Sequence, residues 1–466
     1  MESAVHRQYR QLTNDVDAFP GDHQQRSQNV FLVHPFVRPS TSRDAALIQR
    51  HTATPIESQL QEAVSLIRSI PGWRVVHGTT VPVDVSTRKR GIWHERQQQA
   101  LSDLAERHHA SVVFVNIEML SITQRVWLRN CFARPVYDRY GVVLHIFKIF
   151  ANSPESRLQV LLAEIPYLRR RVFNVVDAGR GFAVSSRAGG RQHHEKLIND
   201  RERLLRQRLS TLQRHNERQI LGAKKRHGVP IVAIVGYTNA GKTTLINRLT
   251  GDAAAIGEDR LFATLNVRAY HGRLPNESRV TYVDTVGFIS RLPTMLIASF
   301  RATLSRIAFS DIILHVCDVS DPDMVEKKKT VWETLKQLEV PSDVLARSIQ
   351  INNKADLADP DQLLDIQRSD GGIAVSCETG AGFAQLASAV ECAVMRAGNL
   401  RARRLHLPSD AYAEQLERLQ GLRNVVIKSV QPSDDHSKVA ITAIVSDDQW
   451  SKFMAAFPSI KRQRSQ

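Results

Sequence analysis

The pattern of apolar and polar positions divides the chain into five segments. Strand-like apolar runs alternate with helical patterns over 28–152, which predicts an N-terminal α/β domain. Apolar residues spaced three or four apart then predict an antiparallel helical hairpin over 153–227. Strands and helices alternate again over 228–400, and 401–466 reads as a small α+β domain. Residues 1–27 are polar without periodicity, so we expect a flexible arm there.

The hairpin and the tail have boundaries that the pattern predicts in more detail. We expect the first hairpin helix to open at Pro154 and to kink at Pro166, because an internal proline removes a backbone donor. The second helix is expected from about His193, after a loop that includes Gly189 and Gly190. The tail is expected to contain one helix and two strands, at 410–419, 425–430 and 438–445.

Composition limits the classes of protein to consider. The 466 residues are 42% hydrophobic, which is enough for several packed cores. No apolar run approaches the ~18–20 residues that cross a bilayer, so no membrane span is expected. The four cysteines show no CxxC spacing, which argues against a zinc site or a disulfide framework. A soluble protein with reduced cysteines is therefore expected.

The positive charge is concentrated in the hairpin. The chain has a formal net charge of +16, and residues 154–226 hold 17 Lys and Arg against 7 Asp and Glu. A solvated helix surface normally mixes both signs, so this imbalance favours contact with nucleic acid. Arg180, Arg187 and Arg191 are the candidate RNA contacts at the tip, because a glycine-rich loop can approach a phosphate backbone closely.

An apolar strand, Ile231–Val235, leads directly into a phosphate-binding motif. Residues 236–243 fit GxxxxGK[ST], and a helical pattern follows. Inward-turned amides and the helix N-terminus would surround the phosphates, while Lys242 supplies a cation and Thr243 a magnesium ligand. The nucleotide-binding residues predicted from this segment are Gly236, Tyr237, Thr238, Asn239, Ala240, Gly241, Lys242, Thr243 and Thr244.

A second motif, DxxG, ends another apolar strand about 45 residues later. An acid at a strand end can hold a magnesium-bound water, and the following glycine amide can sense the γ-phosphate. The residues predicted from this motif are Asp284, Thr285, Val286 and Gly287. Phe288 follows, where many GTPases have a water-positioning glutamine, so intrinsic hydrolysis is expected to be slow and the catalytic water-positioning group is not identified.

The third motif, NKxD, follows the expected strand 348–351 and selects guanine over adenine. Asp356 would accept two bonds from the guanine N1 and N2 groups, a donor pair that adenine lacks. The residues predicted to bind the base are Asn353, Lys354 and Asp356, together with Ser376 and Cys377, where a small residue can present a backbone amide to the guanine oxygen.

Two further residues are candidate cation ligands. Thr264 lies in the loop between the first two motifs and is expected to complete the coordination of Mg²⁺ with Thr243. Asn239 either coordinates a monovalent cation such as K⁺ between the phosphates or stabilises the turn of the loop.

These motifs resemble those of the HflX family of translational GTPases. The segments that carry the resemblance are GYTNAGKTTLIN at 236–247, LFATL at 261–265, DTVGFI at 284–289, PVYDR at 135–139 and LQVLLAEIPYL at 158–168. The resemblance implies a P-loop GTPase domain with a mostly parallel sheet and helices on both faces. An α/β domain with a helical hairpin would precede it, and a small α+β domain would follow.

The resemblance also implies a role and partners. The family's GTPases bind the large ribosomal subunit and its rRNA through the hairpin loop, and split or recycle ribosomes or assist large-subunit assembly. Asn239 corresponds to the residue associated with potassium dependence. The chain is most similar to the organellar branch, so a mitochondrial location is expected, with a cytoplasmic one otherwise, and a monomer. The family's Gly-Glu-Thr-Gln-Leu-Glu stretch is replaced by GRQHHE at 190–195, which places in doubt the loop's contact with rRNA and any ATPase activity of the N-terminal half.

The sequence is therefore compatible with three functions. The first is a GTP-hydrolysing enzyme that is stimulated by the ribosome. The second is a module that binds GTP and tethers RNA with little turnover, an alternative that Phe288 keeps open. The third is a signalling GTPase that acts on protein effectors, in which the basic hairpin only confers solubility.

Overall fold

The computed structural model describes residues 27–37, 55–83, 92–177, 188–251, 268–285, 287–289, 305–409, 412–421, 425–432 and 438–456. Two compact units are present, and the division between them falls at Gln213 and Arg214, within one long helix. Within the described ranges, no helix is both long and apolar enough to cross a bilayer. All four cysteines are free.

The N-terminal domain contains a four-stranded parallel sheet in the order β2-β1-β3-β4. Its core forms because the central strands are apolar on both faces, as in the fully buried β3. The strands are β1 Gln28–Val37, β2 Trp73–Val83, β3 Val112–Val115 and β4 Val136–Asp138. The helices are α3 Ile56–Arg68, α4 Glu95–Arg107, α5 Ile122–Phe132 and α6 Arg139–Phe150.

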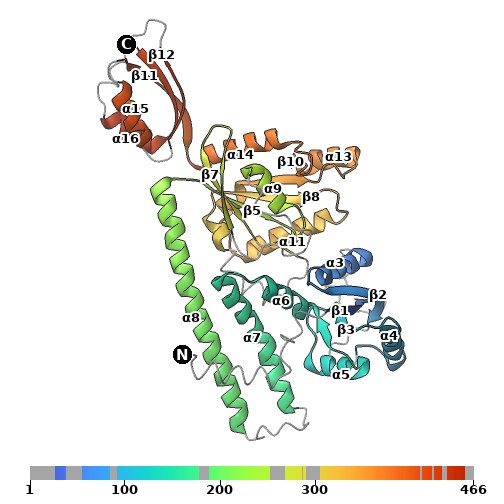
Figure 1. Cartoon of the computed structure of the whole chain (residues 1–466). Coiled ribbons are helices and arrows are strands. Elements are labelled where there is room, and N and C mark those ends of the chain that lie inside the picture. The colour runs from blue at the N-terminus through green and yellow to red at the C-terminus, as the bar shows by residue number, and fades with distance from the viewer. Residues whose placement is uncertain are drawn as a thin grey trace. The chain divides into compact units, whose positions relative to one another are not determined.

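Two long helices, α7 Pro154–Asp177 and α8 Ala188–His227, form the hairpin (Figure 1). Ile165 of α7 packs against Ile198 and Leu205 of α8. α7 is continuous through Pro166. The expected start of the second helix near His193 is wrong, because α8 already includes the glycines at 189 and 190.

The tip arginines are only partly described. Because α8 begins at Ala188, the backbone of Arg191 lies in its first turn, and the expectation that Arg191 belongs to the tip loop is wrong. Arg180 and Arg187 lie outside the described residues. The gain from continuing the hydrogen-bonded ladder offsets the roughly 1 kcal/mol that each helical glycine costs.

The nucleotide-motif segment forms a six-stranded sheet in the order β10-β9-β8-β5-β7-β6, with only β6 antiparallel to its neighbour. The strands are β5 Ile231–Gly236, β6 Arg268–Arg273, β7 Arg279–Asp284, β8 Ile312–Asp318, β9 Ser348–Asn353 and β10 Ile373–Ala374. The α-helices are α9 Lys242–Thr250, α11 Met324–Gln337, α12 Ser342–Ala346, α13 Pro360–Asp370 and α14 Phe383–Ala397, and a short 3-10 helix spans Ser305–Phe309. The predicted fold class, a P-loop domain with a mostly parallel sheet, is confirmed.

A separate antiparallel sheet, in the order β11-β13-β12, forms the C-terminal part. It contains β11 Leu400–Pro408, α15 Tyr412–Gly421, β12 Val426–Pro432, β13 Lys438–Ser446 and α16 Asp447–Ala456. The sequence pattern missed β11, because its arginines resemble a linker. Arg403 is instead held inside the domain, with Asp447 at 2.5 Å and the Trp450 ring centroid 5.2 Å away.

Candidate functional site

The predicted phosphate-binding loop lies at the carboxyl end of β5, between that strand and α9. β5 is fully buried and pairs in parallel with β7 and β8, so the loop opens at the edge of the sheet where doubly wound folds bind ligands. Gly241 has φ of +90°, and a Cβ there would lie 2.2 Å from Nδ2 of Asn353. The loop therefore needs glycine at this position both for its backbone angle and for space.

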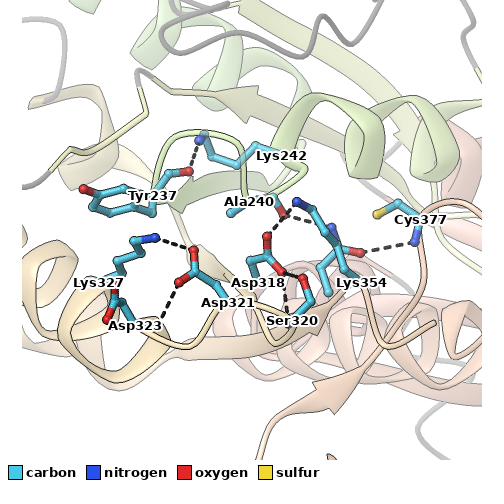
Figure 2. Close-up of polar contacts among 11 residues, drawn as sticks. Tyr237, Ala240, Lys242, Asp318, Ser320, Asp321, Asp323, Lys327, Lys354 and Cys377 are labelled. Atoms are coloured by element: carbon cyan, nitrogen blue, oxygen red, sulfur yellow. Dashed lines mark hydrogen bonds and ion pairs between the residues drawn. The ribbon is translucent and has the colours of Figure 1, made fainter. Parts of the chain in front are cut away.

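Lys242 points back into the loop (Figure 2). Its buried Nζ donates to the carbonyls of Tyr237 at 2.7 Å and Gly236 at 3.2 Å. Burial lowers the pKa of Lys242 to about 8, and the opposing charge of Asp284 limits that decrease. An anionic phosphate placed in the loop would relieve the cost of burying this cation, which is the chemistry that the motif predicts.

Asp284 ends β7 directly beside the start of α9. It is completely buried, and its Oδ2 accepts a hydrogen bond from Thr243 Oγ1 at 3.3 Å. A carboxylate and a hydroxyl at this separation are hard oxygen donors of the kind that Mg²⁺ prefers, so the pair fits the predicted cation. Thr285 fixes the segment, because its hydroxyl donates to the carbonyl of Ile234 at 2.6 Å.

Gly287 and Phe288 lie against the phosphate loop. A Cβ on Gly287 would be 2.8 Å from Thr238 Cγ2 and 3.0 Å from Lys242 Nζ, so the backbone approaches the loop closely. Thr238 N donates to the Phe288 carbonyl at 2.7 Å, and Phe288 N donates to the Gly236 carbonyl at 3.1 Å. Phe288 is buried, so its ring is part of the hydrophobic core.

Asn353 joins the phosphate loop to the base-binding loops. Its amide nitrogen donates to the Ala240 carbonyl at 2.8 Å, and its amide oxygen accepts from Cys377 N at 3.2 Å. Lys354 has a positive φ of 62° and its Nζ lies 2.6 Å from Asp318 Oδ2. Asp356 is exposed, which leaves its carboxylate accessible to a ligand.

The Ser376–Cys377 turn is held by hydrogen bonds. Ser376 N donates to the Ala381 carbonyl at 3.0 Å, so the Ser376 amide already has an acceptor within the turn. Arg248 of α9 reaches the same turn, with Nε 2.9 Å from the Cys377 carbonyl and NH2 bonded to the Glu378 carbonyl. Burial raises the pKa of Cys377 to about 12, so its thiol stays protonated at neutral pH.

The structure also shows contacts around the site that sequence reasoning missed. The loop after β8 is held by its own acids: Asp318 Oδ1 accepts from Ser320 Oγ at 2.6 Å, and Asp321 pairs with Lys327 (Figure 2). Lys327 Nζ also lies 5.3 Å from the centroid of the Tyr237 ring. The spacing DVSDPD at 318–323, directly after a buried strand, was the available signal for this loop.

Of the remaining predicted residues, two are described by the structure and two are not. Asn239 is exposed with φ of 63°, a conformation that asparagine tolerates, which suits either predicted role. Thr244 lies in the first turn of α9. Thr264 and Val286 lie outside the described residues. Within the described residues no group of three or more His, Cys, Asp or Glu is placed to hold a metal ion.

Known proteins share these features. A family model described as a 50S ribosome-binding GTPase matches residues 231–348. The mouse protein named "Putative GTP-binding protein 6" is 34% identical over 440 residues, which cover 93% of this chain and 82% of that protein. GTPase HflX of Lacrimispora saccharolytica is 37% identical over 307 residues, 65% of this chain and 71% of its own length. A chloroplastic GTP-binding protein of Arabidopsis thaliana is 36% identical over 281 residues, 54% of this chain and 45% of its own length.

The identity to GTPase HflX extends beyond the nucleotide motifs over most of both chains. The fold and the order of the motifs agree with that similarity. The chain is therefore a P-loop GTP hydrolase and belongs to the HflX family of GTPases.

Proposed function

We propose that the chain binds GTP at the loops around Lys242 and uses the nucleotide to act on the large ribosomal subunit. The observation that carries the nucleotide site is the convergence of Lys242, Asp284 and Asn353 on one loop through the contacts described above. Lys242 would neutralise phosphate charge, and Asp356 would accept from the guanine. The ribosomal partner is supported by the family model and by the basic hairpin.

The bound nucleotide would carry Mg²⁺ held by the Thr243 hydroxyl and through Asp284, with Thr264 as the third protein oxygen. When bound, the ion neutralises the charge that develops between the β- and γ-phosphates. We further propose that Asn239 binds K⁺ beside the phosphates, because its exposed side chain lies at the turn of the loop. The other residues in contact with GTP would be those predicted from the three motifs.

The physiological role that these parts favour is ribosome splitting and recycling or large-subunit assembly. The hairpin would contact rRNA through Arg180, Arg187 and Arg191, and a monomer would suffice, because the described motifs lie in one chain. The resemblance to organellar members and the chloroplastic relative favour work inside an organelle, the mitochondrion by resemblance.

A second role, an RNA tether that turns over little GTP, is favoured by one observation. Phe288 stands where a water-positioning side chain is expected, and its ring is buried. This residue cannot orient an attacking water by hydrogen bonding, so turnover would depend on the ribosome, on K⁺ or on a group from a partner.

The decisive experiment is GTP turnover by the purified chain in potassium buffer, with and without large ribosomal subunits. We expect a stimulation of tenfold or more, which is about 1.4 kcal/mol off the barrier. Replacing K⁺ by Na⁺ should reduce turnover if Asn239 binds the ion. Tight GTP binding without stimulation would instead support the RNA tether or a signalling GTPase with protein effectors. Binding to ribosomal particles that is released by salt would support the RNA tether over the signalling GTPase.

The hairpin contact is tested by reversing the charge of Arg180, Arg187 and Arg191 to glutamate. We expect weaker co-sedimentation with large subunits and unchanged GTP affinity. Retained co-sedimentation would contradict the assignment of these arginines. Fractionation of cells that express the tagged chain tests the compartment, and recovery outside mitochondria would contradict that part of the proposal.

A further inference from the structure

An open groove of about 620 Å³ runs along the hairpin between α7 and α8. All of its lining residues lie in the first compact unit, and none of them belongs to the nucleotide motifs. The volume falls within the ~300–1,000 Å³ of small-molecule sites. The lining side chains that the argument uses are Arg157, Leu158, Leu204, Gln207, Arg208 and Leu212.

The floor of the groove is apolar and fixed in place. Leu158 packs against the hairpin core, which contains the buried Ile165, Ile198 and Leu205. Leu204 is half-buried on the facing helix, so both sides contribute aliphatic surface. A planar or aliphatic group can therefore displace water from this floor with a gain in free energy.

The rim of the groove is cationic, and its two arginines have no acidic partner among the described residues. Arg157 is exposed, and among the described residues its guanidinium donates only to the Ala151 carbonyl, at 3.1 Å. Arg208 is exposed and makes no hydrogen bond or ion pair with any described residue. By contrast, Arg169 and Arg206 of the same hairpin both pair with Glu202.

The sequence explains why Arg208 has no partner on its own helix. Residues three and four positions from Arg208 on α8 are Leu204, Leu205, Thr211 and Leu212, and none is acidic. Helical ion pairs form at this spacing, so the helix itself cannot neutralise Arg208. The groove thus combines an apolar floor with two guanidinium groups that are available to an anion.

We propose that this groove binds one unstacked nucleotide of single-stranded RNA. Arg157 and Arg208 contact its phosphate, the base lies on the leucine floor, and Gln207 bonds the edge of the base, because an amide offers both donors and acceptors. Guanidinium groups are suited to this task, since they bind phosphate in a planar fork and stack on bases.

A polyanion fits the surroundings better than a single acidic side chain does. The solvent face of α8 continues the positive charge beyond the groove, with Lys196, Arg203 and Arg214 all exposed. Such a stripe attracts a repeating phosphate backbone. The proposal rests on the proposed function only for the source of the RNA, which would be the large subunit.

The test uses the full-length chain and a fluorescein-labelled single-stranded RNA of roughly 12 nucleotides, within the site sizes of single-strand binders. Anisotropy is measured over a range of salt for the wild type and for the double variant Arg157→Gln, Arg208→Gln. We expect affinity to fall by tenfold or more, and the slope of log K against log salt to decrease by about 0.7, the value for one phosphate. Unchanged GTP turnover shows that the variant is folded.

Two further variants make the test specific. Lys196→Gln with Arg203→Gln removes the same charge from α8 outside the groove, and we expect a clearly smaller loss. Equal losses in the two doubles would overturn the groove as the site. Arg157→Lys with Arg208→Lys keeps the charge without the planar fork, and we expect affinity to stay low. Full recovery would overturn the guanidinium contact.

A glutamate-rich peptide of matching charge separates RNA from an acidic protein partner. If the peptide binds as tightly as RNA and depends on the same two arginines, the RNA proposal is overturned. Co-sedimentation with large subunits separates this inference from the proposed function. A wild type that sediments with subunits but binds RNA independently of the groove contradicts only the inference. A chain whose groove binds RNA but that does not co-sediment with large subunits contradicts only the proposed function.

Discussion

The side-chain amide of Asn353 donates a hydrogen bond of 2.8 Å to the carbonyl of Ala240, across 113 positions of the chain. The contact joins the end of β9 to the phosphate-binding loop. The same side chain accepts from Cys377 N, so one asparagine fixes the positions of three loops. The geometry of the base-binding side is therefore coupled to that of the phosphate-binding side.

Gly241→Ala should disrupt this junction. Its Cβ would lie 2.2 Å from Asn353 Nδ2 and would displace the amide. We expect affinity for GTP and GDP to fall about a hundredfold, or about 2.8 kcal/mol, measured by titration calorimetry.

Gly251→Ala is the matched control for that variant. Gly251 also has a positive φ, of 69°, but a Cβ added there would meet nothing within 4 Å. We expect only a stability loss of about 1–2 kcal/mol and normal nucleotide affinity. Equal losses of affinity in both variants would show that backbone strain, and not the Asn353 contact, matters.

Asp356→Asn should change the preferred base. Asp356 is exposed at the loop after β9, where its carboxylate can accept from guanine. Charged hydrogen bonds of this kind are worth about 1.5–3 kcal/mol, so GTP should bind roughly tenfold to a hundredfold more weakly. Xanthosine triphosphate should bind better, because its extra oxo group accepts from the new amide. Equal weakening of both nucleotides would contradict the guanine contact.

GTP affinity should fall as pH rises above about 8. The pKa of buried Lys242 is lowered to about 8, whereas bound phosphate would restore it toward its ordinary value of 10.5. Between these values the complex holds a proton that the nucleotide-free protein has lost, so affinity should fall by up to tenfold per pH unit. Asp356→Asn keeps the lysine and should show the same slope. A flat profile would contradict the role of Lys242.

The same titration has a consequence for stability. Because the folded pKa of Lys242 is lowered, the unfolded chain binds more protons between pH 8 and 10.5. This group therefore makes the nucleotide-free protein more stable as pH rises through that window, and saturating GTP should abolish the trend, because the bound and unfolded pKa values are then similar. Chemical unfolding with and without GTP measures both.

Arg248→Ala should weaken GTP and GDP alike. Arg248 donates to the carbonyls of Cys377 and Glu378, so its loss releases the base-binding turn from α9. We expect roughly tenfold weaker binding of both nucleotides, or about 1.4 kcal/mol, by calorimetry. Arg347→Ala removes another arginine, one whose side chain contacts only Asp343 among the described residues, and should leave affinity unchanged. A normal affinity in Arg248→Ala would show that the turn holds its shape without α9.

The sequence predicts the local parts of this protein well and the distant contacts poorly. The predicted bounds of the strand before the phosphate loop are correct to one residue. A run of apolar residues that ends in a glycine motif is compatible with few structures other than a buried strand. The pattern places the start of α8 too late, because glycines at 189 and 190 resemble a loop until the rest of a 40-residue helix is considered. It misses β11 because the charged residues of this segment obscure the alternation of apolar and polar positions at Leu405 and Leu407.

The site shows the same division. The three motifs could be found from residue spacing, since the residues of each motif lie within one short continuous segment. The contact of Arg248 with Cys377 and the ion pair of Lys354 with Asp318 could not, because they join segments whose proximity is set by strand order. No spacing rule links an arginine to a carbonyl 129 positions away.

These long-range bonds also decide when the site can form during synthesis. The phosphate loop leaves the ribosome 113 residues before Asn353, which at ~5–20 residues per second is a delay of roughly 6–23 s. Throughout that interval the nascent chain lacks the loop that selects guanine. A growing chain therefore becomes selective for its nucleotide only after β9 has been added beside β8, and a chain released early would carry a phosphate loop without the means to choose a base.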